Sequence, residues 1–155
     1  MTAATRRLAA VSIVGLLLAI GCSSTSANSL TGSESQVYDL TFSSVVIVLQ
    51  GTDVSIKYEA SNDDPAILVV NTAEIVNVAN STIDLTQLVV GQPRGVLENV
   101  NGGGDGVTNE LTIMRGTVVF DDIPAVGKNL SGQFNATLSD GYTLNGTFSD
   151  TVNAP

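Results

Sequence analysis

Carboxylates in loop-forming segments are the side chains of this chain best suited to chemistry. Asp63 and Asp64 lie together before a proline, and Asp105 and Glu110 lie in or just after a glycine-rich run at 101–106. Clustered carboxylates are the usual calcium ligands, but an EF-hand loop starting at 101 would lack two of its oxygen ligands. These four residues are therefore weak calcium candidates, and no confident metal site is predicted.

A second carboxylate pair, Asp121 and Asp122, follows an apolar run that ends at Phe120. Two carboxylates can act as acid and base in a glycosidase when a defined distance separates them. Adjacent residues at a strand end point to opposite faces, which places this pair poorly. The chain contains no histidine and no tryptophan, so it lacks the commonest general base and the best sugar-stacking ring. We therefore expect that the protein is not an enzyme, and a carboxylate-dependent hydrolase is the least favoured alternative.

The chain is strongly acidic, with a formal net charge of −9. All fifteen acidic residues come after position 21, where the basic residues are Lys57, Arg94, Arg115 and Lys128. Nucleic-acid binding depends on lysine and arginine neutralising phosphates, so we expect no nucleic-acid partner. The negative charge is typical of a solvated, soluble surface.

The elements that must position these residues follow a period of two, which indicates β-strands. Residues 44–49 are almost wholly apolar, which predicts a strand buried on both faces. The segment 82–90 fits either a strand or a short helix. The other predicted strands are 38–42, 54–58, 66–70, 74–78, 96–100 (an edge strand), 111–114 and 117–120. No stretch shows a convincing helical period. About seven to nine short strands predict an all-β antiparallel sandwich, with a small β-barrel as the alternative.

A C-terminal β-hairpin is predicted with a definite register. Leu138 must pair with Tyr142 to keep both apolar sets on one side, which leaves a three-residue loop with Gly141 in the left-handed conformation. This register sets Phe134 opposite Gly146, and Phe148 opposite Gly132, so that each ring covers a glycine. The outward face is uncharged and polar: it carries Ser131, Gln133, Asn135, Thr137, Thr143, Asn145 and Thr147. It is either a solvated sheet face or a ladder that binds a glycan or a protein.

The N-terminal 21 residues have the layout of an export signal. Arg6 and Arg7 precede an apolar run from 8 to 21 that is short for a membrane-spanning helix, which needs roughly 20 apolar residues. The run ends Ala19-Ile20-Gly21-Cys22, and Cys22 is the single cysteine of the chain. These four residues resemble a lipobox, the signal-peptidase II site of bacterial lipoprotein precursors, with alanine at the position where that family prefers leucine.

The resemblance implies cleavage between Gly21 and Cys22 and a covalent lipid on the Cys22 sulfur. An ordinary secretory signal with Cys22 near the cut by chance is the alternative. We expect a signal peptide at 1–21, a flexible tether at 22–35 and one β domain at 36–155. The expected protein is a lipoprotein of the cell envelope whose domain is a binding, adhesion or structural module. Calcium-stabilised binding is the runner-up. Ser23 follows the cysteine, and in this respect the chain resembles lipoproteins that are sorted to the outer membrane, if the host has one.

Overall fold

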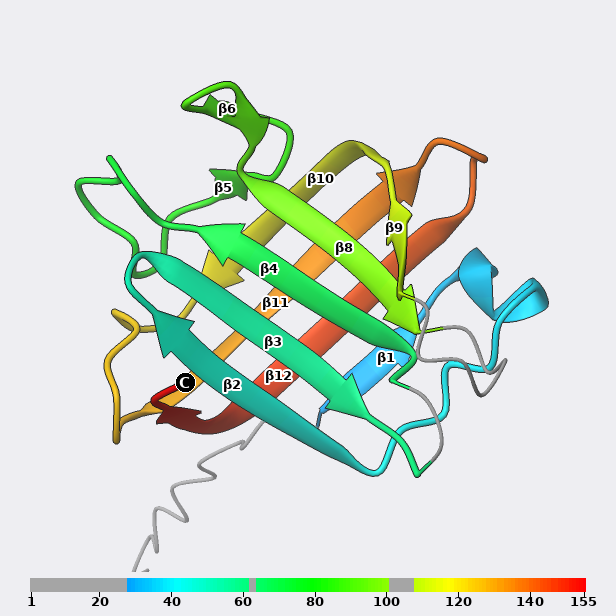
Figure 1. The fold of residues 1–155 in the computed structure, drawn as a ribbon, viewed down its shortest axis with the longest axis horizontal. Coiled ribbons are helices and arrows are strands. Elements are labelled where there is room, and N and C mark those ends of the chain that lie inside the picture. Colours follow the sequence, from blue (N-terminus) through cyan, green and yellow to red (C-terminus); the bar gives the residue numbers. More distant parts are fainter. Residues whose placement is uncertain (1–27, 62–63, 101–107) are drawn as a thin grey trace, which may run out of the picture.

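The chain folds as an all-β protein, as the sequence predicts (Figure 1). A computed structural model describes residues 28–61, 64–100 and 108–155. In chain order the strands are β1 (Ser29–Thr31), β2 (Ser44–Gln50), β3 (Asp53–Glu59), β4 (Ala66–Asn71), β5 (Ile83–Asp84), β6 (Leu88–Val89), β7 (Gln92–Pro93), β8 (Gly95–Val100), β9 (Thr108–Leu111), β10 (Ile113–Phe120), β11 (Asn129–Leu138) and β12 (Thr143–Asn153). One 3₁₀ helix, η1 (Ser33–Gln36), follows β1, and the described residues form no α-helix.

One strongly curled sheet contains all the strands except β6 and β7, which pair with each other. Its order is β5-β10-β11-β12-β2-β3-β4-β8-β9, and β1 pairs with β12 beside this path. The pairings are antiparallel except between β12 and β2, where Val152 lies beside Ile47. That parallel pairing joins two sides that face each other (Figure 1). We call them the β11–β12 layer (β5, β10, β11, β12 and β1) and the β3–β4 layer (β2, β3, β4, β8 and β9).

The core lies between the two layers and follows the period of two. Val54, Ile56 and Tyr58 of β3 are completely buried, whereas Ser55 and Lys57 between them point outward. The inward residues of β11 and β12 are buried in the same alternation: Leu130, Gly132, Phe134, Ala136, Leu138, Leu144, Gly146, Phe148 and Val152. Burial of one aliphatic or aromatic side chain contributes about 1.5–3 kcal/mol, so the alternation itself drives the layers together.

The C-terminal hairpin has the predicted register. The Leu138 amide donates to the Tyr142 carbonyl (2.8 Å), the Gly141 amide donates to the Leu138 carbonyl (3.0 Å), and Gly141 has a φ of 90°. Phe134 lies opposite Gly146, and Gly132 lies opposite Phe148. A Cβ atom on Gly146 would overlap the Phe134 ring, and one on Gly132 would overlap the Phe148 ring. The prediction that each ring covers a glycine is therefore confirmed.

Two predicted strands are wrong. Residues 38–42 bury Leu40 but pair with no strand, and the Asp39 carboxylate accepts the Thr41 amide (2.9 Å), which occupies an amide that a ladder would use. Residues 74–78 form a loop, because the Asn71 side chain accepts the Ala73 amide (2.9 Å). Extended backbone alternates its side chains whether or not its amides pair with a neighbour, so the sequence period alone could not separate these cases.

Other details also differ from the sequence prediction. Outward Val46 and Val48 of β2 are only half-buried, so this strand is buried on one face rather than two. The predicted edge strand at 96–100 is β8, which lies between β4 and β9. The ambiguous segment 82–90 forms the short strands β5 and β6 rather than a helix. One continuous strand, β10, runs through Gly116.

The predicted tether at 22–35 extends too far along the chain. Residues 29–31 form β1, which pairs with β12 by placing Ser29 beside Thr147 and Thr31 beside Asn145. The following residues 33–36 form η1. The Ser33 amide donates to the Thr143 hydroxyl (3.2 Å), and the Thr143 amide donates to the Ser33 hydroxyl (2.9 Å). The folded domain therefore begins at least as early as residue 28, within a segment whose composition resembles a linker.

Candidate functional site

The residues expected to carry the lipid, and two of the four residues expected to hold calcium, lie outside the described residues. This is the case for Gly21, Cys22, Asp63 and Asp105. Cleavage and lipid attachment at Cys22 therefore stay predictions. Of the calcium candidates, Asp64 and Glu110 belong to the described part of the chain.

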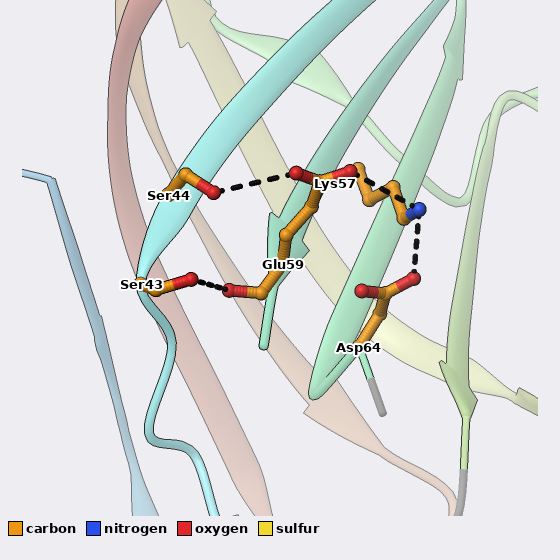
Figure 2. Close-up of polar contacts among 5 residues, drawn as sticks. All are labelled: Ser43, Ser44, Lys57, Glu59 and Asp64. Atoms are coloured by element: carbon orange, nitrogen blue, oxygen red, sulfur yellow. Dashed lines mark hydrogen bonds and ion pairs between the residues drawn. The ribbon is translucent and has the colours of Figure 1, made fainter. Parts of the chain in front are cut away.

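Asp64 belongs to an ion-pair cluster on the outer face of the β3–β4 layer (Figure 2). Lys57 Nζ lies 2.9 Å from the Asp64 carboxylate and 3.3 Å from the Glu59 carboxylate. The Ser44 hydroxyl donates to Glu59 (3.3 Å). The pKa of Lys57 is raised, mainly because its ammonium donates to Asp64. This arrangement uses Asp64 as a partner of a lysine and gives no sign of a cation site.

Glu110 lies on β9 directly opposite Glu98 of β8, a neighbour that sequence reasoning did not identify. Like charges directly opposite one another in a sheet are destabilising. Among residues 28–61, 64–100 and 108–155, no group of three or more histidine, cysteine, aspartate or glutamate side chains could hold a metal ion. Calcium binding stays a prediction.

Asp121 and Asp122, the pair considered for acid–base chemistry, have separate partners. The Ser131 hydroxyl donates to the Asp121 carboxylate (2.6 Å), and the Ile123 amide donates to the Asp122 carboxylate (2.7 Å). Both residues are exposed. Each carboxylate therefore serves the local structure at the end of β10.

Glu34 of η1 is a buried carboxylate that sequence reasoning missed. It is completely buried, and neither carboxylate oxygen has a hydrogen-bond partner. The pKa of Glu34 is raised, first by its burial and then by the negative charge of Asp140. No signal could have found it, because a glutamate within a serine-rich run is typical of a solvated linker.

An extended polar surface lies on the outer face of β11, β12 and β1. The strand pairings place outward residues in rows, with Asn135 opposite Asn145 and Asn145 beside Thr31. The next row contains Gln133, Thr147 and Ser29, and the Ser29 and Thr147 hydroxyls are 2.8 Å apart. We name this set the polar ladder: Ser29, Thr31, Gln133, Asn135, Asn145 and Thr147. Sequence reasoning identified its β11 and β12 members but missed those of β1.

A shallow groove follows the polar ladder. Its volume is about 340 Å³, and besides the six ladder residues it is lined by Phe134 and Gly146. Both of these have inward-facing positions in the strand alternation. The Asn135 amide group donates to the Thr117 hydroxyl of β10 (2.8 Å), which fixes one side of the ladder. The groove therefore offers hydroxyl and amide groups on a rigid sheet, without a charged side chain.

No protein-family model, no curated protein and no solved structure matches the chain significantly.

Proposed function

We propose that the protein is a non-catalytic binding module, held at a bacterial envelope membrane by lipid on Cys22, whose polar ladder binds a neutral glycan. The observation that carries the glycan proposal is the uncharged groove of the polar ladder. Hydroxyl and amide groups both donate and accept hydrogen bonds, as the hydroxyls of a sugar do. An uncharged surface in a chain of net charge −9 also avoids the desolvation of fixed charges on binding.

The regular spacing of the ladder suits an extended chain rather than a single small ligand. Neighbouring strands are about 4.8 Å apart, so the side chains within one row repeat at that distance across β11, β12 and β1. Each hydrogen bond contributes only about 0.5–1.5 kcal/mol net. Affinity would come from several sugar units bound at once, which favours a polysaccharide over a free monosaccharide.

Lipid attachment is supported by the leader and by the position of its single cysteine. A diacylglyceryl group together with an acylated amine anchors firmly, whereas one chain anchors only marginally. No helix among the described residues is long and apolar enough to cross a membrane. We place the protein in the outer membrane if the host has one. Radiolabelled palmitate should enter the wild-type chain but not Cys22→Ala, and equal labelling of both would disprove the lipid site.

The glycan proposal is tested by co-sedimentation with chitin and with an insoluble β-1,3-glucan. The test variant is Asn135→Ala combined with Asn145→Ala, which removes two exposed amides from the groove. The matched control is Ser55→Ala, a polar outward residue of the β3–β4 layer. Loss of two hydrogen bonds of about 1 kcal/mol each should weaken binding by about 10- to 30-fold. Failure of the wild-type protein to bind either polysaccharide, or equal binding by the double variant, would overturn the proposal.

A further inference from the structure

A group of exposed apolar side chains differs in chemical character from the polar ladder. Seven large hydrophobic side chains of the described residues are at least half exposed, and five of them belong to three loops. Val76 lies between β4 and β5, Leu88 and Val90 lie on the β6–β7 hairpin, and Ile123 and Val126 lie between β10 and β11. We name these five residues the apolar rim. Scattered single hydrophobics are normal on a surface, but a concentration on connected loops is not.

Hydrogen bonds connect the three loops to one another. The Asn80 amide donates to the Phe120 carbonyl (2.6 Å), which joins the β4–β5 loop to the end of β10. The buried Arg94 at the base of the β6–β7 hairpin donates from Nη1 to the carbonyls of Asn71 (2.6 Å) and Ala73 (2.9 Å). The β6–β7 hairpin is therefore held to the β4–β5 loop, and that loop to the end of β10, so the three loops of the apolar rim are connected at their bases.

The tip of the β6–β7 hairpin carries an exposed valine that does not stabilise the fold. Val90 and Gly91 connect Val89 to Gln92 and have φ values of 51° and 83°, as in a type I′ turn. Asparagine or aspartate is strongly preferred at the first of these positions, and positive φ is a genuine outlier for a β-branched residue. Val90 is also 95% exposed. The chain therefore keeps a strained valine where it gains nothing from packing within the domain.

The 121–128 loop of the rim lies toward the end of the domain from which the N-terminal segment approaches. Asn28 and Ser149 are joined by two hydrogen bonds (2.6 and 3.4 Å), and β1 begins beside the middle of β12, where Ser29 pairs with Thr147. Val152, three residues after Ser149 on β12, exchanges hydrogen bonds with Gly127 and Lys128 of the loop that carries Ile123 and Val126. Five residues separate Cys22 from Asn28. Even fully extended, that segment spans at most about 20 Å.

We propose that the apolar rim is a lipid-contacting surface that inserts its side chains into the bilayer to which Cys22 is anchored. The inference rests on the proposed lipid attachment, because the short segment after Cys22 keeps this end of the domain close to the membrane. Glu74, Asp121 and Asp122 flank the rim and are exposed. These negative charges disfavour an anionic lipid surface, so the rim fits a neutral or zwitterionic one.

The experiment places a fluorescent reporter on the rim of the full, lipid-modified protein. Val90→Cys is labelled with an environment-sensitive maleimide dye and reconstituted into phosphatidylcholine vesicles. The acylated Cys22 sulfur cannot react, so the dye reports only on position 90. We expect a blue shift on reconstitution and quenching by nitroxide-labelled lipids. The matched control is Val37→Cys, which is 50% exposed beside η1, at the opposite end of the β11–β12 hairpin from the 121–128 loop. Its dye should show neither change.

The outcomes separate the two proposals. Vesicle-bound protein whose Val90 dye behaves like the Val37 dye overturns the inference and leaves the lipid anchor intact. Wild-type protein that itself reacts with maleimide and leaves the vesicles overturns the anchor, and the inference falls with it. A second variant, Val90→Asn, distinguishes contact from folding, because asparagine suits the turn. It should melt at the same or a higher temperature and reduce the blue shift of a dye at Ile123→Cys. An undiminished shift would contradict a shared lipid-contacting rim.

Discussion

The two layers of this protein have inward faces of the same apolar character, but their outward faces differ in chemical character. Both pack alternate apolar residues into one core, as Ile56 does from β3 and Phe148 from β12. Outward, the β11–β12 layer carries the uncharged polar ladder, whereas the β3–β4 layer combines half-buried Val69 and Val96 with the Lys57 ion pairs. Packing constrains the inward face of a strand, while its outward face can carry other properties. The polar ladder, which carries no charged side chain, is therefore the part of the outward surface that is more informative about function.

The largest effect should come from filling the inward space of the β11–β12 layer with Gly146→Ala. A Cβ atom there would overlap the Phe134 ring and the Tyr58 hydroxyl, so both layers would have to shift. Overpacking of this kind costs about 2–3 kcal/mol, measured by urea denaturation. The control is the adjacent outward substitution Asn145→Ala, which should stay within about 0.5 kcal/mol of the wild type. Equal effects of the two would contradict the distinction between inward and outward faces.

A smaller effect should follow from Tyr58→Phe, which weakens the connection between the layers. The buried Tyr58 hydroxyl of the β3–β4 layer donates to the Thr147 carbonyl of the β11–β12 layer (3.0 Å). Loss of this hydrogen bond should cost about 1 kcal/mol at neutral pH.

The same variant should change the alkaline stability profile. Burial raises the pKa of Tyr58, so the folded protein holds this proton more tightly than the unfolded chain does. The contribution is complete below the unfolded pKa of about 10 and decreases as the pH rises above it. Denaturation between pH 8 and pH 11 should show a shallower decline for Tyr58→Phe than for the wild type. Identical slopes would show that Tyr58 is not protected from ionisation.

The smallest effect should come from Lys57→Met on the outward face of the β3–β4 layer. The side chains of Lys57 and Glu59 are 37% and 36% exposed, so solvent screens their attraction. Such pairs contribute about 0.5 kcal/mol, and a salt concentration of about 1 M should remove the difference from the wild type. Asn135→Ala on the opposite outward face involves no charge and should show no salt dependence. A salt-dependent effect of Asn135→Ala on the free energy of unfolding would contradict this difference between the two faces.

Whether a prediction succeeded depended largely on how far apart in the chain the contacting residues lie. The register of the C-terminal hairpin was predictable because Leu138 and Tyr142 are near neighbours and their parity decides which face is apolar. The pairing of β1 with β12 was not, because Ser29 and Thr147 are far apart in the chain and both are polar. Burial of Glu34 follows from the same nonlocal docking. Residues 38–42 show the converse failure, in which a correct period did not produce a strand.

By itself the sequence determined the β class, the inward sets of β3, β11 and β12, the hairpin register and the acidic charge, since each depends on residue type and short-range spacing. Its leader and Cys22 also predict a lipid-anchored protein. Only the tertiary structure decided that β1 completes the polar ladder and that Val76, Val90 and Ile123 lie on connected loops. Both groupings arise where the curled sheet brings distant segments together, mainly through hydrogen bonds of the backbone, which every residue type can make.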